Sequence, residues 1–108
     1  MPDWHDVASL DSFAASDAIA VGVDGREIAI WLVNGKVFAT DNICTHGMAR
    51  LCDGFLTGHE IECPHHQGRF DVRTGAATCA PAKVALATYP ARLEGNRVQV
   101  QVEATRAG

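Results

Sequence analysis

Residues 18–40 have the sequence AIAVGVDGREIAIWLVNGKVFAT, and two turn dipeptides divide them into three β-rich runs. Asp24-Gly25 and Asn34-Gly35 both favour the tight primed turns that join neighbouring antiparallel strands. The runs themselves are rich in Val, Ile and aromatic residues, which suit a pleated and half-buried surface. We therefore predict three consecutive antiparallel strands, over residues 18–23, 26–33 and 36–40.

A further pair of strands is expected near the end of the chain. Residues 97–102 alternate polar and apolar side chains at every step, the period of a strand with one face in water. We expect them to pair with residues 86–93 across Glu94-Gly95-Asn96, and Pro90 suggests an edge or a bulge there. The remaining expected elements are one helical turn at 11–15 and a hairpin within 53–64 around Thr57-Gly58.

The composition is typical of one compact domain. The chain has 108 residues, of which 47% are hydrophobic and 20% charged. We expect a single all-β domain over 1–108, a small sandwich or barrel of antiparallel sheets. A net charge of −4 without any Lys/Arg run indicates no nucleic-acid partner. No segment reaches the roughly 18 apolar residues of a membrane span, and MPDWHDV is unlike a signal peptide, so a cytoplasmic protein is expected.

A stretch of different character, about residues 42–82, interrupts the strand pattern. It is rich in Gly, Cys and His, and it resembles loops set upon a scaffold, where functional groups usually lie. Two of its loops each combine one cysteine with one histidine close to a glycine: Cys44-x-His46 in NICTHGMAR (42–50), and Cys63-x-x-His66 in ECPHHQGRF (62–70).

These two Cys/His pairs indicate a metal centre. Cysteines in a reducing compartment are more often ligands, catalytic groups or buried thiols than a disulfide framework. Soft thiolates select zinc, Cu(I) or iron–sulfur clusters. One cysteine and one histidine from each loop suit a single small ion poorly. They suit a two-metal rhomb well, with both cysteines on one metal and both histidines on the other.

Cys44-Thr45-His46 and Cys63-Pro64-His65-His66 resemble the C-x-H…C-x-x-H signature of Rieske [2Fe–2S] proteins. Residues 39–81 closely resemble the ferredoxin components of bacterial aromatic-ring-hydroxylating dioxygenases of the naphthalene and biphenyl type. The resemblance implies the small Rieske fold of iron–sulfur proteins, with a cluster-binding subdomain of two loops at about 42–82. It implies one [2Fe–2S] cluster, no ligand role for His65, and four ligands: Cys44, His46, Cys63 and His66.

Departures from the high-potential branch of that family bear on the redox potential. Respiratory Rieske proteins join their two loops by a disulfide, but Ala49 and His65 occupy the matching positions here. Those proteins also place a serine and a tyrosine hydroxyl near the cluster, where this chain has Gly68 and Phe70. Because fewer hydrogen bonds would stabilise the reduced cluster, we expect a potential of about −150 mV, the low end of the Rieske range.

The resemblance also implies a function and partners. The chain would carry single electrons from an NADH-dependent flavoprotein ferredoxin reductase to a terminal ring-hydroxylating oxygenase, in the catabolism of aromatic compounds. It would be an electron-transfer component and a monomer, not an enzyme. Transient redox contacts are small, and the expected docking rim around the two histidines is Gly47, Met48, Gln67 and Pro81.

Two other functions fit the sequence less well. A structural Cys₂His₂ zinc module is disfavoured because zinc sites usually group their ligands as C-x₂₋₄-C and H-x₃₋₅-H. A self-sufficient oxygenase would need a second domain with a 2-His-1-carboxylate iron site, for which the chain is too short. Two further cysteines, Cys52 and Cys79, lie outside the ligand spacing and are expected to be buried, inert thiols.

Overall fold

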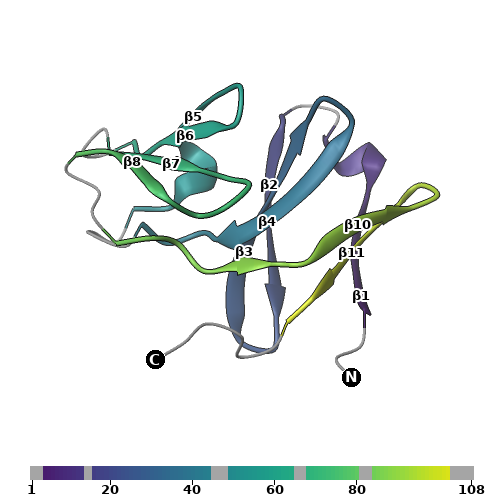
Figure 1. Cartoon of the computed structure of the whole chain (residues 1–108). Coiled ribbons are helices and arrows are strands. Elements are labelled where there is room, and N and C mark those ends of the chain that lie inside the picture. The colour runs from purple at the N-terminus through teal and green to yellow at the C-terminus, as the bar shows by residue number, and fades with distance from the viewer. Residues whose placement is uncertain (1–3, 14–15, 45–48, 65–67, 81–83, 103–108) are drawn as a thin grey trace.

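The computed structural model describes residues 4–13, 16–44, 49–64, 68–80 and 84–102. Within these ranges the chain forms short strands in three antiparallel sheets, together with two 3₁₀ turns (Figure 1). The predicted all-β class is confirmed. None of the helical segments in the described ranges is long and apolar enough to cross a membrane.

The first sheet contains the predicted three-strand run. Its strands lie in the order β2 (Ala18–Val23), β3 (Arg26–Val33), β4 (Lys36–Asp41) and β9 (Thr88–Tyr89). Asp24 and Gly25 have φ values of 50° and 79°, and Asn34 and Gly35 have 53° and 79°. A positive φ at both central residues is what a type I′ turn requires. Both hairpins are therefore confirmed, turns included.

The second sheet pairs β1 (Trp4–Ser9) with β11 (Arg97–Gln101), which also pairs with β10 (Ala91–Glu94). The β10–β11 hairpin confirms the predicted pairing, but β1 was not expected. The single strand predicted over 86–93 is wrong: it is divided at Pro90, with β9 joining β4 and β10 joining β11. Proline lacks the N–H that would continue a ladder, so the chain changes sheets there.

The third sheet has the order β5 (Phe55–Thr57), β6 (Glu60–Glu62), β7 (Arg69–Asp71) and β8 (Ala77–Cys79). The predicted β5–β6 hairpin is confirmed, with Gly58 at a φ of 60° in its turn. We expected loops after it, and β7 and β8 correct that expectation. The helical turn expected at 11–15 is the 3₁₀ turn η1 (Leu10–Phe13), and residues 14–15 lie outside the described ranges. A second 3₁₀ turn, η2 (Leu51–Asp53), precedes β5.

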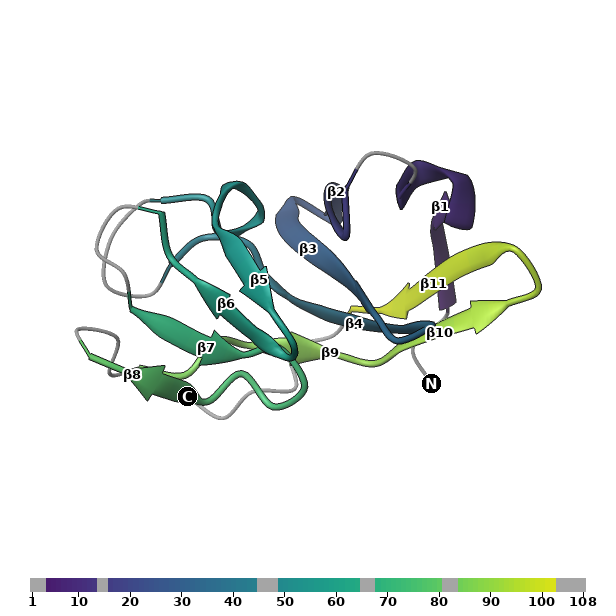
Figure 2. The same cartoon turned by 90° about the horizontal axis from the view of Figure 1, so that it is seen from above.

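The sheets enclose two hydrophobic cores that share strand β3. Figures 1 and 2 show β5–β8 at one end of the molecule, β1, β10 and β11 at the other, and β2–β4 between them. Successive side chains of a strand point to opposite faces, so Ile28 and Ile30 enter one core while Ala29 and Trp31 enter the other. We call these the scaffold core (Ala8, Phe13, Val23, Ile28, Ile30, Val37, Ala39, Ala87, Tyr89, Val98 and Val100) and the cysteine-side core (Ala29, Trp31, Val33, Cys44, Ala49, Leu51, Ile61, Cys63, Phe70, Val72 and Leu86).

Candidate metal centre

The first predicted ligand loop leaves the end of β4 and returns to η2. The N–H of Cys44 donates to the carbonyl of Ala49 over 2.9 Å, and Ile43 forms a β-bridge with Arg50. One step further out, the N–H of Leu51 donates to the carbonyl of Asn42 over 2.6 Å. These bonds form a short antiparallel stem, so the backbone at Cys44 is held from both sides.

The second predicted ligand loop joins β6 to β7 and has the same closure. The N–H of Cys63 donates to the carbonyl of Gly68 over 2.8 Å. In both loops the cysteine therefore bonds to the residue five positions later. The strands β6 and β7 pair directly below this bond, with Glu62 opposite Arg69. A rigid hairpin thus positions the second cysteine.

Both cysteines are buried in the same hydrophobic core. Cys44 is 2% exposed and Cys63 is 0% exposed, and neither forms a disulfide. Leu51, Ile61 and Phe70 belong to the same core. Two buried cysteines that belong to one apolar core supply the soft, water-shielded donors that an iron–sulfur cluster needs. The part of the donor set that the structure describes fits such a cluster.

The other predicted site residues lie outside the described ranges. They are His46 and His66 among the ligands, the neighbouring His65, and the docking-rim residues Gly47, Met48, Gln67 and Pro81. Among the residues that are described, no group of three or more His, Cys, Asp or Glu side chains could hold a metal ion. The sequence-predicted ligands remain the candidates for this centre.

Sequence reasoning missed a polar network beneath the first loop. Asn42, which is 0% exposed, bonds to Cys52 through its side-chain oxygen and to Glu27 through its side-chain nitrogen. Arg50 donates to the same Glu27 carboxylate over 2.8 Å. The Arg50 guanidinium, and then the Asn42 carboxamide, hold the pKa of Glu27 below its usual value. The only sequence signal was an asparagine two residues before Cys44.

The two remaining cysteines differ from expectation. Cys52 is half-buried, and its sulfur accepts a hydrogen bond from Asn42 over 3.3 Å. Cys79 is exposed at the end of β8, so its predicted burial is wrong. Its strand position explains this, because Cys79 pairs with the exposed Arg69 at the outer side of the sheet while Phe70 points inward.

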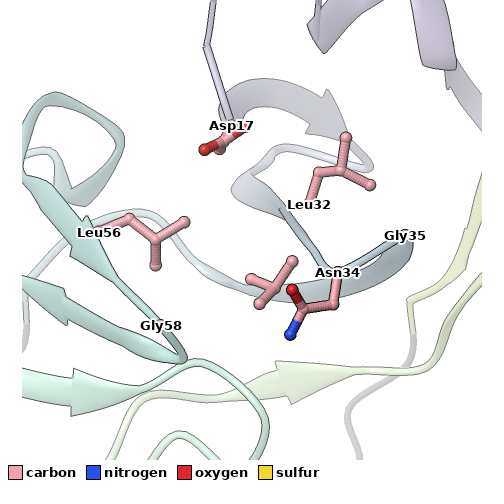
Figure 3. Close-up of a pocket in the computed structure, with 7 residues that line it drawn as sticks. Asp17, Leu32, Asn34, Gly35, Leu56 and Gly58 are labelled. Carbon is pink, nitrogen blue, oxygen red and sulfur yellow. The ribbon is translucent and has the colours of Figure 1, made fainter.

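A pocket of about 350 Å³ lies elsewhere, between the third sheet and the β3–β4 turn (Figure 3). Leu56 lines one side of it and Leu32 and Asn34 line the other, with Asp17 above. Neither Cys44 nor Cys63 lines this pocket, and it contains a single carboxylate. It therefore offers no set of metal ligands.

Comparisons with known proteins show the family of this chain. Residues 3–90 match the model of the Rieske [2Fe–2S] domain family. The chain is 52% identical over 101 residues to the ferredoxin component of the naphthalene 1,2-dioxygenase/salicylate 5-hydroxylase systems of Ralstonia sp., covering 94% of this chain and 97% of that relative.

Solved structures show the same fold. The ferredoxin of carbazole 1,9a-dioxygenase from Nocardioides aromaticivorans IC177 superposes with a TM-score of 0.85 at 37% identity, over 90% of this chain and 95% of that one. A chain in the complex of reduced oxygenase and oxidized ferredoxin in carbazole 1,9a-dioxygenase matches with a TM-score of 0.84 at 32% identity, over 91% and 92% of the two chains. This chain therefore belongs to the Rieske [2Fe–2S] domain family, and within it to the electron-carrying ferredoxins.

Proposed function

We propose that this ferredoxin carries single electrons from an NADH-dependent flavoprotein reductase to a terminal oxygenase that hydroxylates aromatic rings. The observation that carries the proposal is the near-full-length similarity to a protein named as a ferredoxin component of such a system. The relatives' names mention naphthalene, salicylate and carbazole. Because these compounds differ, the proposal extends to aromatic compounds as a class.

The proposed ligands are Cys44 and Cys63 for one iron and His46 and His66 for the other. When bound, one [2Fe–2S] cluster supplies a one-electron couple at the Rieske range of potentials. The chain's own contribution is to bury both thiols and to fix both cysteine backbones through the bonds to Ala49 and Gly68. Apolar neighbours such as Ile61 and Phe70 keep water away from the sulfur atoms.

A low potential is part of the proposal. Phe70 is completely buried in the cysteine-side core, and Gly68 has no side chain. Neither position offers a hydroxyl that could donate to the cluster, and hydrogen bonds to sulfur raise the potential of such centres. We expect about −150 mV, which suits a carrier reduced ultimately by NADH.

We also propose a domain organisation, an oligomeric state and a docking surface for the chain. The chain forms one Rieske domain over 1–108, with a cluster-binding subdomain at about 42–82, and acts as a monomer in the cytoplasm. Its docking rim comprises Gly47, Met48, Gln67 and Pro81. Uncharged side chains around the exit for the electron would suit a small, transient interface. The alternative of a structural zinc module has no support from the comparisons, which name iron–sulfur proteins.

The first experiment is the EPR spectrum of the purified protein after dithionite reduction, with iron and acid-labile sulfide assayed on the same sample. We expect a rhombic signal with the low average g value of a histidine-ligated cluster, and two irons per chain. Anaerobic mixing of the reduced protein with an oxidised ring-hydroxylating oxygenase should then remove the ferredoxin's own EPR signal, because its electron passes to the oxygenase. An EPR-silent sample that holds stoichiometric zinc would overturn the proposal.

A further inference from the structure

The side chain of Asn42 is enclosed between three segments of the chain. It follows β4 directly, lies two residues before Cys44, and is 0% exposed. Buried amides are costly unless their hydrogen bonds are made. A full set of partners around such a group indicates that the surrounding backbone depends on it.

Every polar group of Asn42 has a partner. Its backbone N–H donates to the carbonyl of Glu27 over 3.1 Å, and its carbonyl accepts from Leu51 over 2.6 Å. Its side-chain oxygen accepts the N–H of Cys52 over 2.8 Å. Its side-chain nitrogen donates to Glu27 Oε2 over 2.5 Å and to the sulfur of Cys52 over 3.3 Å.

These bonds connect the two ends of the first ligand loop. Asn42 lies before the loop in the chain, and Leu51 and Cys52 lie after it. The last backbone bond of the stem joins Leu51 to Asn42. The side-chain oxygen of Asn42 adds one further bond beyond it, to the N–H of Cys52. The stem therefore has fixed bonds from the Cys44–Ala49 closure down to η2.

Glu27 anchors this stem to the scaffold. Its Oε2 atom accepts one hydrogen bond from Asn42, before the loop, and one from Arg50, after it. Glu27 belongs to β3, the strand shared by both cores. One carboxylate oxygen thus connects both ends of the loop to β3, which is the most buried of the described strands.

We infer that Asn42 is a positioning residue, which fixes the backbone that leads into Cys44 for cluster binding through its bonds to Glu27 and Cys52. The inference rests on the proposed function. It assigns to Asn42 no contact with the iron or the sulfide. Its role is to keep the first cysteine in register with the second, whose hairpin has its own strand pairing.

The test compares Asn42→Ala with Val98→Ala in the intact holoprotein. Val98 is equally buried but lies in the scaffold core. Both variants should melt at a lower temperature than the parent. Well below both melting temperatures, Asn42→Ala should lose its cluster to an iron chelator about tenfold faster, which corresponds to about 1.4 kcal/mol of activation free energy. Its EPR g values and midpoint potential should shift, whereas those of Val98→Ala should match the parent.

Variants at Glu27 separate position from charge. Because both donors bind the same oxygen, Glu27→Gln keeps an acceptor in place and should retain the cluster like the parent. Glu27→Ala should behave like Asn42→Ala, and the double variant should be little worse than either single one, since interacting residues are not additive. Hydrogen exchange over residues 42–52 should increase in both Ala variants.

Equal cluster-loss rates and identical EPR spectra in Asn42→Ala and Val98→Ala would overturn the inference. So would additive effects of Asn42→Ala and Glu27→Ala. Failure of the proposed function is a separate outcome, because it would appear in the parent protein as the absence of a Rieske EPR signal.

Discussion

The second ligand loop contains two adjacent histidines, His65 and His66, and two different rules select different ones as the ligand. Both loops are closed by the same bond, from the cysteine to the residue five positions later. Equal offsets from the two cysteines would match His65, not His66, to His46. The signature of the family instead has two residues between the second cysteine and its histidine, which selects His66.

We therefore predict opposite results for two neighbouring substitutions. His66→Ala should abolish the visible absorption and EPR signal of the cluster, because one iron loses a ligand. His65→Ala should keep both spectra, and it serves as the matched control in the same loop. If His65→Ala loses the cluster and His66→Ala retains it, the loops bind with equal offsets and the ligand assignment changes.

The side chain of Tyr89 is buried in the scaffold core and is hydrogen-bonded through its hydroxyl. Its hydroxyl donates to the carboxylate of Asp41 and accepts from Arg26 over 3.4 Å. Burial, and then the hydrogen bond to Asp41, raises the pKa of Tyr89 above its usual value of 10.0. The unfolded chain then ionises at a lower pH than the native protein. The contribution of Tyr89 to stability is complete below about pH 10 and declines as the pH rises through that value.

Tyr89→Phe should remove this alkaline dependence. At pH 8, where the phenol is neutral in both states, the loss of the donor to Asp41 should cost roughly 1–3 kcal/mol of unfolding free energy. The difference between parent and variant should shrink as the pH is raised beyond about 10. Urea unfolding at several pH values measures the difference in unfolding free energy between the two proteins. Tyr89 is the chain's single tyrosine, so no other phenol contributes to it. A constant difference at all pH values would contradict the assignment.

At the scale of elements, the third sheet depends on a close approach at Gly54, between η2 and β5. A Cβ atom added to Gly54 would lie 2.0 Å from the carbonyl oxygen of Glu62, the last residue of β6. That atom is backbone and cannot turn away. Because Cys63 follows Glu62 directly, a shift of this strand end would also displace the second ligand loop.

Gly54→Ala should therefore lower both stability and cluster retention, with a loss of about 1–3 kcal/mol, the usual effect of overpacking. The control is Gly22→Ala in β2, where an added Cβ would meet nothing within 4 Å. Gly22→Ala should be neutral or stabilise the strand by roughly 0.5–1 kcal/mol. Thermal melts and chelator-induced loss of the visible spectrum test the pair, and equal behaviour of the two variants would refute the steric argument.

The elements that sequence reasoning found are those with local signals. The turns at Asp24-Gly25 and Asn34-Gly35 need a positive φ, which these residues tolerate, and both hairpins were predicted. Strands β7 and β8 have three residues each and depend on sheet neighbours, so no periodicity could show them. β1 was missed because its partner β11 lies at the other end of the chain.

The candidate site divides in the same way. The two Cys/His pairs were sufficient to predict a metal centre, and the resemblance to the family signature selected His66 over His65. The role of Asn42 could not be found, because its partners Glu27 and Cys52 are 15 and 10 residues away and meet it only in the folded chain. Cys79 was placed wrongly for a related reason. Its exposure follows from its register against Arg69.

Across the molecule, the two hydrophobic cores have separate functions but share one central strand, β3. The scaffold core lies between the first two sheets, and the cysteine-side core contains both predicted cysteine ligands. β3 contributes alternate side chains to each, so the molecule should unfold as one unit while cluster retention depends mainly on one of its cores.

A matched pair of substitutions tests this division. Ile30 in the scaffold core and Ile61 in the cysteine-side core are 0% and 1% exposed. Replacing either with valine removes one methylene group and should cost about 0.5–1.5 kcal/mol of unfolding free energy in urea titrations. Only Ile61→Val should hasten cluster loss to a chelator under native conditions, because only that cavity lies in the core that encloses Cys44 and Cys63. Equal acceleration in Ile30→Val would mean that global opening, not the packing around the thiols, limits the release of iron.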